Sequence, residues 1–283
     1  MIKFLSRLGK MDRRIVFILL LAAILIPLLF SIRQRFYVDE ATRRLYDYID
    51  RIEPNGRPLL ISFDYDPQVA AELDPMARAV LRHCFARGVR VIGMSLAPQG
   101  DAIGEAIVTQ VAREFGKKSG VDYSYFGFRP GGTIIMLQMG VNTKRALPLD
   151  YYQVPYDSLP MMQNVHNYDD IAMVLSLAGS TYPYSWIIFA GTKFRVKVGA
   201  GQTAVMAPDN YPFLQTGQLV GQMGGMKGGA EYEQLICDAG YYHKPDVASK
   251  AMSAIAYSHL LIILLIVLGN VGYFVSRRLE GRK

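Results

Sequence analysis

The chain has 283 residues, a formal net charge of +7 and two cysteines, Cys84 and Cys237. Two cysteines are too few for a disulfide-rich scaffold; we expect two buried thiols, with a single disulfide as the alternative. The charge lies at the ends, since residues 1–14 contribute 5 − 1 = +4 and residues 276–283 contribute 4 − 1 = +3. The nearly neutral middle lacks a basic, aromatic-rich stripe, which argues against nucleic acid as a partner.

The first predicted element is an uncharged apolar run over residues 15–32. At about 1.5 Å per residue, such a run crosses most of the ~30 Å hydrocarbon core of a bilayer. Its basic leader, residues 1–14, would also suit a signal peptide. However, the run is longer than a usual signal core, and Arg33 and Arg35 follow it instead of a small-residue cleavage site. We therefore predict a retained transmembrane helix.

Residues 33–56 come next and are predicted to form a juxtamembrane helix over 38–52 and a turn that ends at Gly56. Apolar side chains recur there at helical spacing, and the Pro54-Asn55-Gly56 sequence is typical of a turn. This segment is expected to connect the membrane to the domain that follows.

The central domain, residues 57–250, alternates apolar strands with amphipathic helices. Strands are predicted at 58–63, 89–96, 133–139, 171–177 and 195–198, and helices at 74–87, 102–115 and 186–194. Strands that are apolar on both faces and alternate with helices are typical of a parallel sheet with helices on both sides. The predicted fold class is α/β, an open and mostly parallel sheet with Rossmann-like layering. Residues 140–170 form a long irregular insertion of the kind that is usually functional or interface-forming.

A second apolar run, residues 254–275, is predicted to be another transmembrane helix, followed by the basic tail 276–283. The outer flanks of the two spans hold nine Lys and Arg residues and the inner flanks six. Because such residues are retained in the cytoplasm, we predict a cell-membrane protein with both termini cytoplasmic and the domain extracytoplasmic. The expected partners are the lipid bilayer and other membrane subunits or further copies of this chain.

Within the second span, Asn270 lies between small residues, Gly269 and Gly272. A polar side chain in hydrocarbon usually faces a partner helix, and small residues allow close helix packing. These three residues are predicted to contact the first span or another copy of the chain.

Asp64 and Asp66 follow the first predicted strand, at the sheet edge where open α/β proteins bind ligands. Their spacing resembles the first motif of the haloacid-dehalogenase-type phosphatases. That resemblance implies a nucleophilic Asp64, an acid–base Asp66 and a bound magnesium ion. The sequence departs from the motif at Pro67 and Gln68, and it lacks the family's lysine and late acidic pair. The alternative is that both aspartates shape the turn before Pro67.

Other candidate site residues are less specific. His166 lies in a polar cluster before the strand predicted at 171–177; it is a weak catalytic candidate, since a lone loop histidine is more often a hydrogen-bonded loop residue. Gly199, Gly201 and Thr203 follow the last predicted strand and are candidates to line a ligand pocket. The sequence lacks the Cys/His spacing of a metal site, so neither a metal nor a cofactor is predicted.

The sequence contains two glycine-rich stretches, a short one at residues 131–132 and a longer one at residues 217–229. Gly131 and Gly132 precede the strand predicted at 133–139, so they are predicted to form a turn. Residues 210–237 are predicted to form one helix with a glycine face, because apolar residues occupy its other side. The glycine face is predicted to pack tightly on a sheet or a neighbouring helix, and it consists of Gly217, Gly221, Gly224, Gly225, Gly228 and Gly229.

The chain, especially residues 62–67, 75–85 and 218–233, resembles a family of uncharacterised bacterial and archaeal membrane-anchored proteins. The resemblance runs nearly end to end and implies the architecture but no activity. Our leading hypothesis is a non-catalytic, membrane-anchored α/β domain, a structural, scaffolding or sensing subunit of a membrane assembly. The alternative is a metal-dependent hydrolase or a small-ligand-binding domain that uses Asp64 and Asp66.

Overall fold

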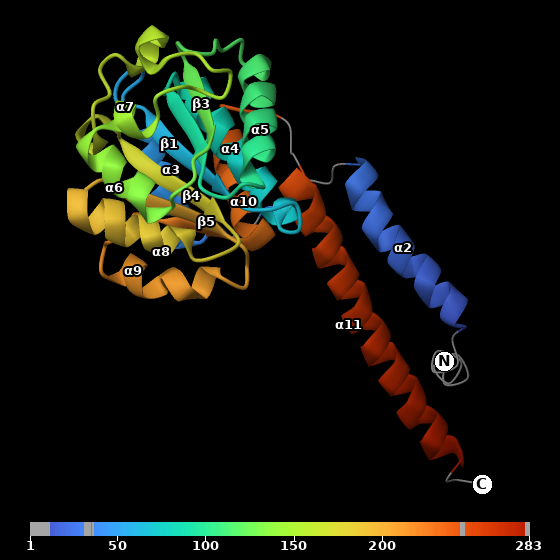
Figure 1. Ribbon diagram of the computed structural model, residues 1–283. Coiled ribbons are helices and arrows are strands. Elements are labelled where there is room, and N and C mark those ends of the chain that lie inside the picture. Colours follow the sequence, from blue (N-terminus) through green and yellow to red (C-terminus); the bar gives the residue numbers. More distant parts are fainter. Residues whose placement is uncertain (1–11, 31–34, 36, 244–246, 281–283) are drawn as a thin grey trace. The chain divides into compact units, whose positions relative to one another are not determined.

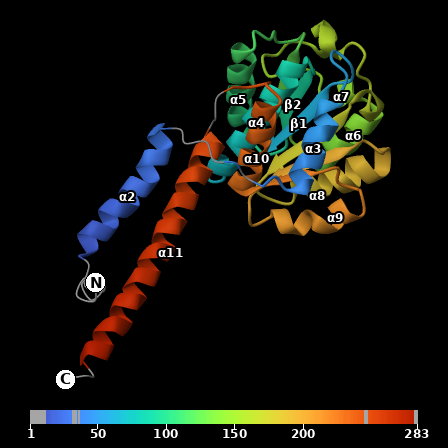
Figure 2. The same cartoon turned by 180° about the vertical axis from the view of Figure 1, so that it is seen from behind.

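The computed structural model describes residues 12–30, 35, 37–243 and 247–280 (Figures 1 and 2). The chain divides into two compact units: a domain, Arg35–Ala248, and a unit made of the two terminal segments. The domain includes the helix α3 (Glu40–Asp50), which the sequence predicts as part of a separate juxtamembrane piece.

Within its described residues, the domain holds a six-stranded parallel sheet in the order β3-β2-β1-β4-β5-β6. The strands are β1 (Leu59–Asp64), β2 (Val91–Ser95), β3 (Tyr123–Phe128), β4 (Met173–Ala178), β5 (Val198–Gln202) and β6 (Gln222–Gly224). Every residue of β1, β2, β4 and β5 is buried, as expected for parallel strands covered on both faces. The predicted open parallel α/β sheet is confirmed.

Two helical layers cover the sheet (Figures 1 and 2). One consists of α3, α4 (Ala70–Arg87), α5 (Gly100–Glu114) and α10 (Gly225–Asp238). The other consists of α6 (Thr133–Val141), α7 (Thr143–Ala146), α8 (Tyr182–Trp186), which continues as a π-helical segment over Ile187–Thr192, and α9 (Tyr211–Gln215). Alternate strand residues face the two layers, so Met173 and Leu175 join the first core cluster and Val174 the second.

The strand predicted at 133–139 is wrong, because these residues form α6 and the third strand is Tyr123–Phe128. Met136 and Met139, three residues apart, are fully buried, whereas Ile134 is 68% exposed, which is the pattern of a helix with one buried face. Gly131 and Gly132 lie in a turn, as predicted, but this turn follows a strand and precedes a helix. The last strand was also predicted too early in the chain, at 195–198, since β5 begins at Val198.

The single glycine-faced helix predicted over residues 210–237 is wrong. The segment contains α9, a turn, β6 and α10. Gly217 in the turn and Gly225 at the start of α10 have φ values of +73° and +61°, in the left-handed region that favours glycine. The sequence pattern thus predicted Gly217 and Gly225 inside a helix, although the backbone at both positions is not helical.

The other four glycines of this stretch occupy different elements. Gly221 precedes β6 and Gly224 ends it, so neither lies in a helix. Gly228 and Gly229 are the pair inside α10. A Cβ on Gly228 would lie 2.8 Å from the Met223 Cα, so this part of α10 packs on the strand before it. The predicted close packing thus holds at single glycines instead of along one face.

A buried polar cluster around His83 joins α3, α4 and the α10 region. His83 Nδ1 lies 2.8 Å from Tyr232 Oη, and Nε2 lies 3.1 Å from Asp50 Oδ1. The imidazole stacks on Tyr46 and Tyr241, with ring centroids 4.6 and 5.2 Å away. Burial lowers the pKa of His83 to about 4, although the hydrogen bond to Asp50 raises it. The neutral ring therefore donates to Asp50 and accepts from Tyr232.

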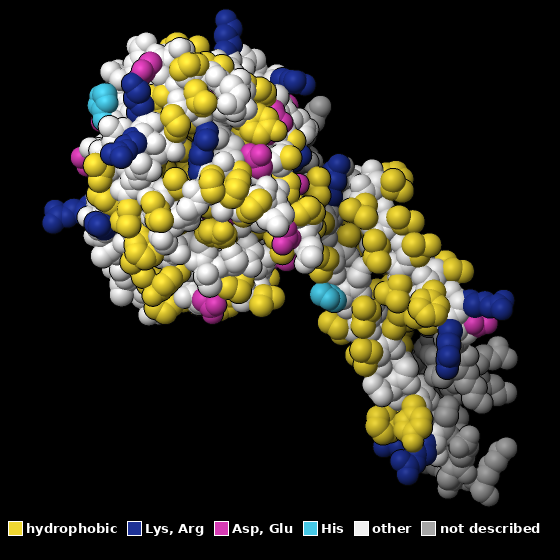
Figure 3. Space-filling model, viewed as in Figure 1, with side chains coloured by type: hydrophobic (Ala, Val, Ile, Leu, Met, Phe, Trp, Pro, Cys, Tyr) yellow, Lys and Arg dark blue, Asp and Glu magenta, His cyan; other side chains and the backbone are white. Residues whose placement is uncertain are grey.

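The terminal unit contains two long apolar helices, α2 (Arg13–Phe30, 18 residues) and α11 (Val247–Glu280, 34 residues). By length and composition both could cross a membrane. Figure 3 shows apolar side chains along them. Asn270 donates a 3.0 Å hydrogen bond to Ile266 O of its own helix, and the space beside Gly269 is open. The helix contact predicted for Gly269, Asn270 and Gly272 stays a prediction.

Helix α3 packs directly on the backbone at the β5–β6 edge of the sheet. A Cβ on Gly221 would lie 2.5 Å from both Ala41 O and Leu45 N of α3. A Cβ on Gly199, in β5, would lie 2.7 Å from Leu45 Cδ1. Real Cβ atoms do not approach backbone this closely, so glycine is required at position 221 for α3 to dock, whereas at position 199 it leaves room for the Leu45 side chain.

We expect Gly221→Ala to destabilise the domain by about 1–3 kcal/mol, because α3 must shift to admit the methyl group. Gly217→Asn, in the same stretch, is the control: nothing lies within 4 Å of its Cβ position, and asparagine tolerates the left-handed backbone. The measurement is urea unfolding of the intact chain, followed by fluorescence of the single tryptophan, the fully buried Trp186. Equal unfolding midpoints for the two variants would show that α3 does not depend on this close approach.

Candidate functional site

The strand order creates a switch point between β1 and β4, because the chain runs outward from β1 to β3 and then returns to β4. Open parallel sheets bind ligands beyond the carboxyl ends of the strands at such a point. A cavity of about 250 Å³ lies there, and its lining includes Asp64, Asp66 and Tyr182. The cavity therefore lies at the edge of the sheet that the sequence predicted, beyond the carboxyl ends of the strands.

The Asp64 carboxylate is buried, with 2% of the residue exposed. Its Oδ1 accepts a 2.7 Å hydrogen bond from Leu96 N, and its Oδ2 accepts a 3.3 Å bond from Trp186 Nε1. Burial raises the pKa of Asp64 to about 6, although these hydrogen bonds favour the ionised form. The side chain thus ties the end of β1 to the loop after β2 and to α8.

Asp66 is half-buried, and its Oδ1 accepts a 2.8 Å hydrogen bond from Gln68 N. This is the local bond by which an aspartate shapes a turn. Tyr65, between the two aspartates, is buried and donates a 2.9 Å bond from Oη to Asp74 Oδ1 of α4. These contacts are the ones expected from the turn-shaping alternative. The phosphatase roles of Asp64 and Asp66 remain an untested hypothesis.

His166 lies before β4, at the amino edge of the sheet, whereas Asp64 ends β1 at the carboxyl edge. The two strands are parallel and in register from Leu59 opposite Met173. The His166 side chain is exposed, and its backbone N donates a 2.8 Å bond to Asp170 Oδ2. The structure therefore does not bring His166 together with the two aspartates.

Gly199 and Gly201 lie inside β5 instead of following it. A Cβ on Gly201 would lie 2.5 Å from Leu177 Cδ2, and the Gly199 position is filled by Leu45, as described above. Both glycines make room for core side chains. Thr203 is buried just after β5, and its carbonyl accepts from Met206 N and Ala207 N. The geometry gives these three residues a packing role beside the cavity described next.

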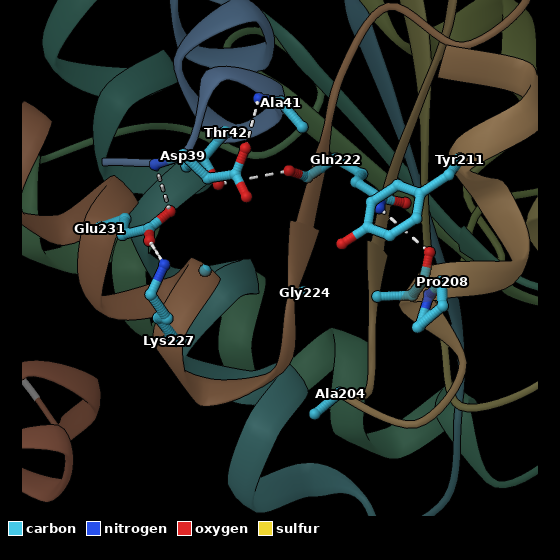
Figure 4. A pocket seen from close by; sticks show the side chains of 12 residues that line it. Asp39, Ala41, Thr42, Ala204, Pro208, Tyr211, Gln222, Gly224, Lys227 and Glu231 are labelled. Atoms are coloured by element: carbon cyan, nitrogen blue, oxygen red, sulfur yellow. Dashed lines mark hydrogen bonds and ion pairs between the residues drawn. The ribbon is translucent and has the colours of Figure 1, made fainter. Parts of the chain in front are cut away.

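A second cavity, of about 290 Å³, lies at the carboxyl end of β6, where α10 begins (Figure 4). Its walls come from the start of α3, the loop after β5, the start of α9, β6 and the first turns of α10. Gly224 is the residue before α10, and no side chain caps the first turn of that helix. The first backbone N–H groups of a helix have no partner within the helix.

Charged side chains line one side of this cavity. Glu231 is 1% exposed; one carboxylate oxygen contacts Lys227 Nζ and the other accepts a 3.2 Å bond from Asp39 N (Figure 4). Asp39 Oδ1 caps α3 by accepting from Ala41 N at 3.1 Å. The lysine side chain is about half exposed, so the pair joins the buried Glu231 to the surface of the domain.

Gln222, in β6, also lines this cavity, but its unpaired side-chain oxygen is buried and closed off from the open space. The residue is 3% exposed and lines the cavity wall. Its Nε2 donates a 3.1 Å bond to Ala207 O, which fixes the orientation of the amide, but its Oε1 has no hydrogen-bond partner. A buried carbonyl oxygen without a donor costs about 1–3 kcal/mol. Sequence reasoning missed this site, although residues 222–229, QMGGMKGG, already place a strand, paired glycines and a lysine before a helix.

The described residues offer little for thiol or metal chemistry. Burial raises the pKa of the Cys84 thiol well above its usual value, and a thiol that stays protonated is a poor nucleophile. No disulfide joins Cys84 to Cys237; Cys84 is buried, as expected, whereas Cys237 is only partly buried. Among these residues there is no group of three or more His, Cys, Asp or Glu that could hold a metal ion.

Comparisons of the chain with protein-family models, curated proteins and solved structures find no match. The class that can be stated is a Rossmann-like α/β domain with a long apolar helix at each end. The resemblance to a family of membrane-anchored proteins remains an expectation from the sequence.

Replacement of Asp64 by Asn should change how stability depends on pH between about 4 and 6. The folded pKa of about 6 exceeds the usual 3.8, so the folded wild-type protein holds this proton more tightly than the unfolded chain. Its stability therefore falls, relative to Asp64→Asn, as pH rises through this range. The fall should be about 3 kcal/mol, from a shift of roughly two pKa units.

The comparison with the variant is necessary because His83, with its lowered pKa, acts in the opposite sense: its contribution is lost as pH falls from 6.5 towards 4. Urea unfolding of both proteins at pH 4, 5, 6 and 7, followed by Trp186 fluorescence, measures the difference. A stability difference that stays constant over this range would mean that Asp64 is not a buried, proton-binding carboxyl.

Proposed function

We propose that this chain is a membrane-anchored, non-catalytic α/β domain that senses a small polar ligand as a subunit of a membrane assembly. The cavity at the start of α10 carries the proposal, because a helix amino terminus without a side-chain cap and a Lys–Glu pair line it together. A concave surface on which a few polar and charged groups converge is typical of binding sites.

The non-catalytic part of the proposal rests on Asp64. It occupies the position at the sheet edge where a catalytic carboxylate would be placed, but each of its oxygens accepts a hydrogen bond from the protein. A nucleophile must also be accessible to its substrate, and Asp64 is only 2% exposed. We therefore assign Asp64 to holding the sheet edge together.

Membrane anchoring is supported by the exposed apolar surface of the terminal helices. Leu29 and Phe30 of α2 are 72% and 74% exposed, and Leu260 and Ile263 of α11 are 64% and 59% exposed. Burial of each such side chain contributes about 1.5–3 kcal/mol, which a bilayer would supply along both helices. With the charge bias of the flanks, this favours spans with cytoplasmic termini and an extracytoplasmic domain.

The sensing role predicts that the protein, purified from its native membrane into nanodiscs, carries a small polar molecule that mass spectrometry detects after denaturation. Ala204→Trp should abolish this, because Ala204 lines the cavity, whereas Val205→Trp should not, because Val205 is 84% exposed and outside the lining. Cross-linking of the same preparation should identify partner subunits. Magnesium-dependent hydrolysis of p-nitrophenyl phosphate that is lost in Asp64→Asn would instead establish the hydrolase alternative.

The proposed orientation predicts that a cysteine at the exposed Ser158 reacts with a membrane-impermeant maleimide in intact cells. A cysteine added after Lys283 should react only after lysis. The unmodified chain is the background control for Cys84 and Cys237. Labelling of the added terminal cysteine, but not of Ser158→Cys, in intact cells would reverse the orientation.

A further inference from the structure

The cluster around His83 includes the segment that connects α10 to α11 along the chain. Tyr241 and Tyr242 begin this segment, and the backbone N–H groups of both bond to Ile236 O of α10. The Tyr241 ring stacks on the imidazole, and its hydroxyl donates a 2.8 Å bond to Asp50 Oδ1. Tyr241 is partly exposed whereas His83 is fully buried, so the Tyr241 ring separates the imidazole from solvent on this side.

The hydrogen bonds of His83 fit the neutral imidazole and not the protonated one. Nε2 donates to Asp50, and Nδ1 accepts from the Tyr232 hydroxyl. A second proton would lie on Nδ1, which would then donate to Tyr232 Oη. Among the described residues, the Tyr232 hydroxyl has no hydrogen-bond partner besides His83, and Tyr232 is fully buried. Protonation of the closed cluster therefore leaves a buried O–H group without an acceptor, which costs stability.

The other groups around the imidazole do not reverse its preference for the neutral form. Asp50 already accepts from Tyr241, and Arg87 Nε lies 3.4 Å from the same carboxylate oxygen. Burial raises the pKa of Asp50, but its hydrogen bonds with His83 and Tyr241 help to lower it below the usual value, so Asp50 stays ionised in mild acid. The remaining groups stay protonated because burial raises their pKa values, and they are Tyr46, Tyr232, Tyr241 and Cys84.

From this arrangement we infer that the cluster around His83 is an acid-sensitive switch, which holds residues 241–243 on the domain at neutral pH and releases them in acid. Displacement of the Tyr241 ring admits water to the imidazole. His83 then takes up a proton from solvent, and water replaces the bond that the Tyr232 hydroxyl loses. Because the open form binds one proton more than the closed form, acid favours opening. The inference does not depend on the cavity at the start of α10, and it adds acid to what the domain senses.

Hydrogen–deuterium exchange of the full chain in nanodiscs at pH 7, 6 and 5 tests the switch. Protection factors of the Tyr241 and Tyr242 amides report its opening, because both N–H groups bond to Ile236 O in the closed form. The pKa of His83 is about 4 in the closed form and returns to the ordinary 6.5 in the open form. We therefore expect these protection factors to fall about twentyfold from pH 7 to pH 5. The amides of β1 and β4 should stay protected, because the sheet does not open.

Two variants separate the charge of the imidazole from its packing. His83→Gln carries both a donor and an acceptor but does not titrate, so the Tyr241 and Tyr242 protection factors should be equal at pH 7 and pH 5. His166→Gln is the matched control: this side chain is exposed and outside the cluster, so the twentyfold change should persist.

Three results would overturn the inference. The first is protection of Tyr241 and Tyr242 in the unmodified chain that does not change between pH 7 and pH 5, a result that needs no variant to fold. The second is a twentyfold change that persists in His83→Gln, because another group would then be responsible. The third is loss of protection in β1 and β4 together with residues 241 and 242, because the whole domain would then unfold in acid.

Discussion

The direct contact between α3 and the backbone of the β5–β6 edge is the constraint on which the candidate site depends. Gly199 and Gly221 carry no side chain where α3 approaches, so Leu45 reaches the strands and Thr42 Oγ1 can donate a 3.3 Å bond to Gln222 O. A side chain at Gly221 would push the helix outward, and one at Gly199 would displace Leu45. The same contact positions the amino terminus of α3, and with it Asp39, at the cavity wall. Close packing and the candidate site therefore have one structural origin.

Helix α10 connects this site with the rest of the molecule. Its first turn lines the cavity, and its Tyr232 belongs to the buried cluster around His83. Two residues after Glu231, Glu233 Oε1 accepts a 3.3 Å bond from Ala248 N, the last residue of the domain. An acidic side chain beside a helix amino terminus is stabilising. Helix α10 thus contributes to the cavity, to the His83 cluster and to the end of the domain.

Much of the fold could be predicted from the sequence, because β1, β2 and β4 are continuous apolar runs bounded by turns. β3, YSYFGF, was missed because its buried tyrosines and serine do not form such a run, while the more apolar TIIMLQM drew the strand assignment to what is α6. The glycine stretch was misread for a related reason. Its spacing of four fits a helix, but the backbone requirements of Gly217 and Gly225 depend on long-range packing that periodicity does not record.

The site was predicted less well than the fold. The aspartates at the end of β1 mark the correct edge of the sheet, yet the contacts of Asp64 with Leu96 and Trp186 come from segments 32 and 122 residues away along the chain. The cavity beside α10 likewise draws on residues from 39 to 231, which only the sheet order brings together. A local motif can therefore point to an edge, but it cannot say which side chains there are already satisfied.

The state of the buried amides at this edge gives the unsatisfied oxygen of Gln222 its meaning. Gln202, at the end of β5, donates a 2.9 Å bond to Ser180 O and accepts from Asn210 Nδ2, so its amide is used at both ends. Gln222 lies in the neighbouring strand, β6. Its Nε2 donates to Ala207 O, but its Oε1 has no donor. Rotation of the amide would only place two carbonyl oxygens against each other. Because the neighbouring amide is fully paired in the same environment, poor packing of the whole edge does not explain the difference, and Gln222 Oε1 is a buried acceptor whose missing hydrogen bond costs stability at the last strand of the sheet.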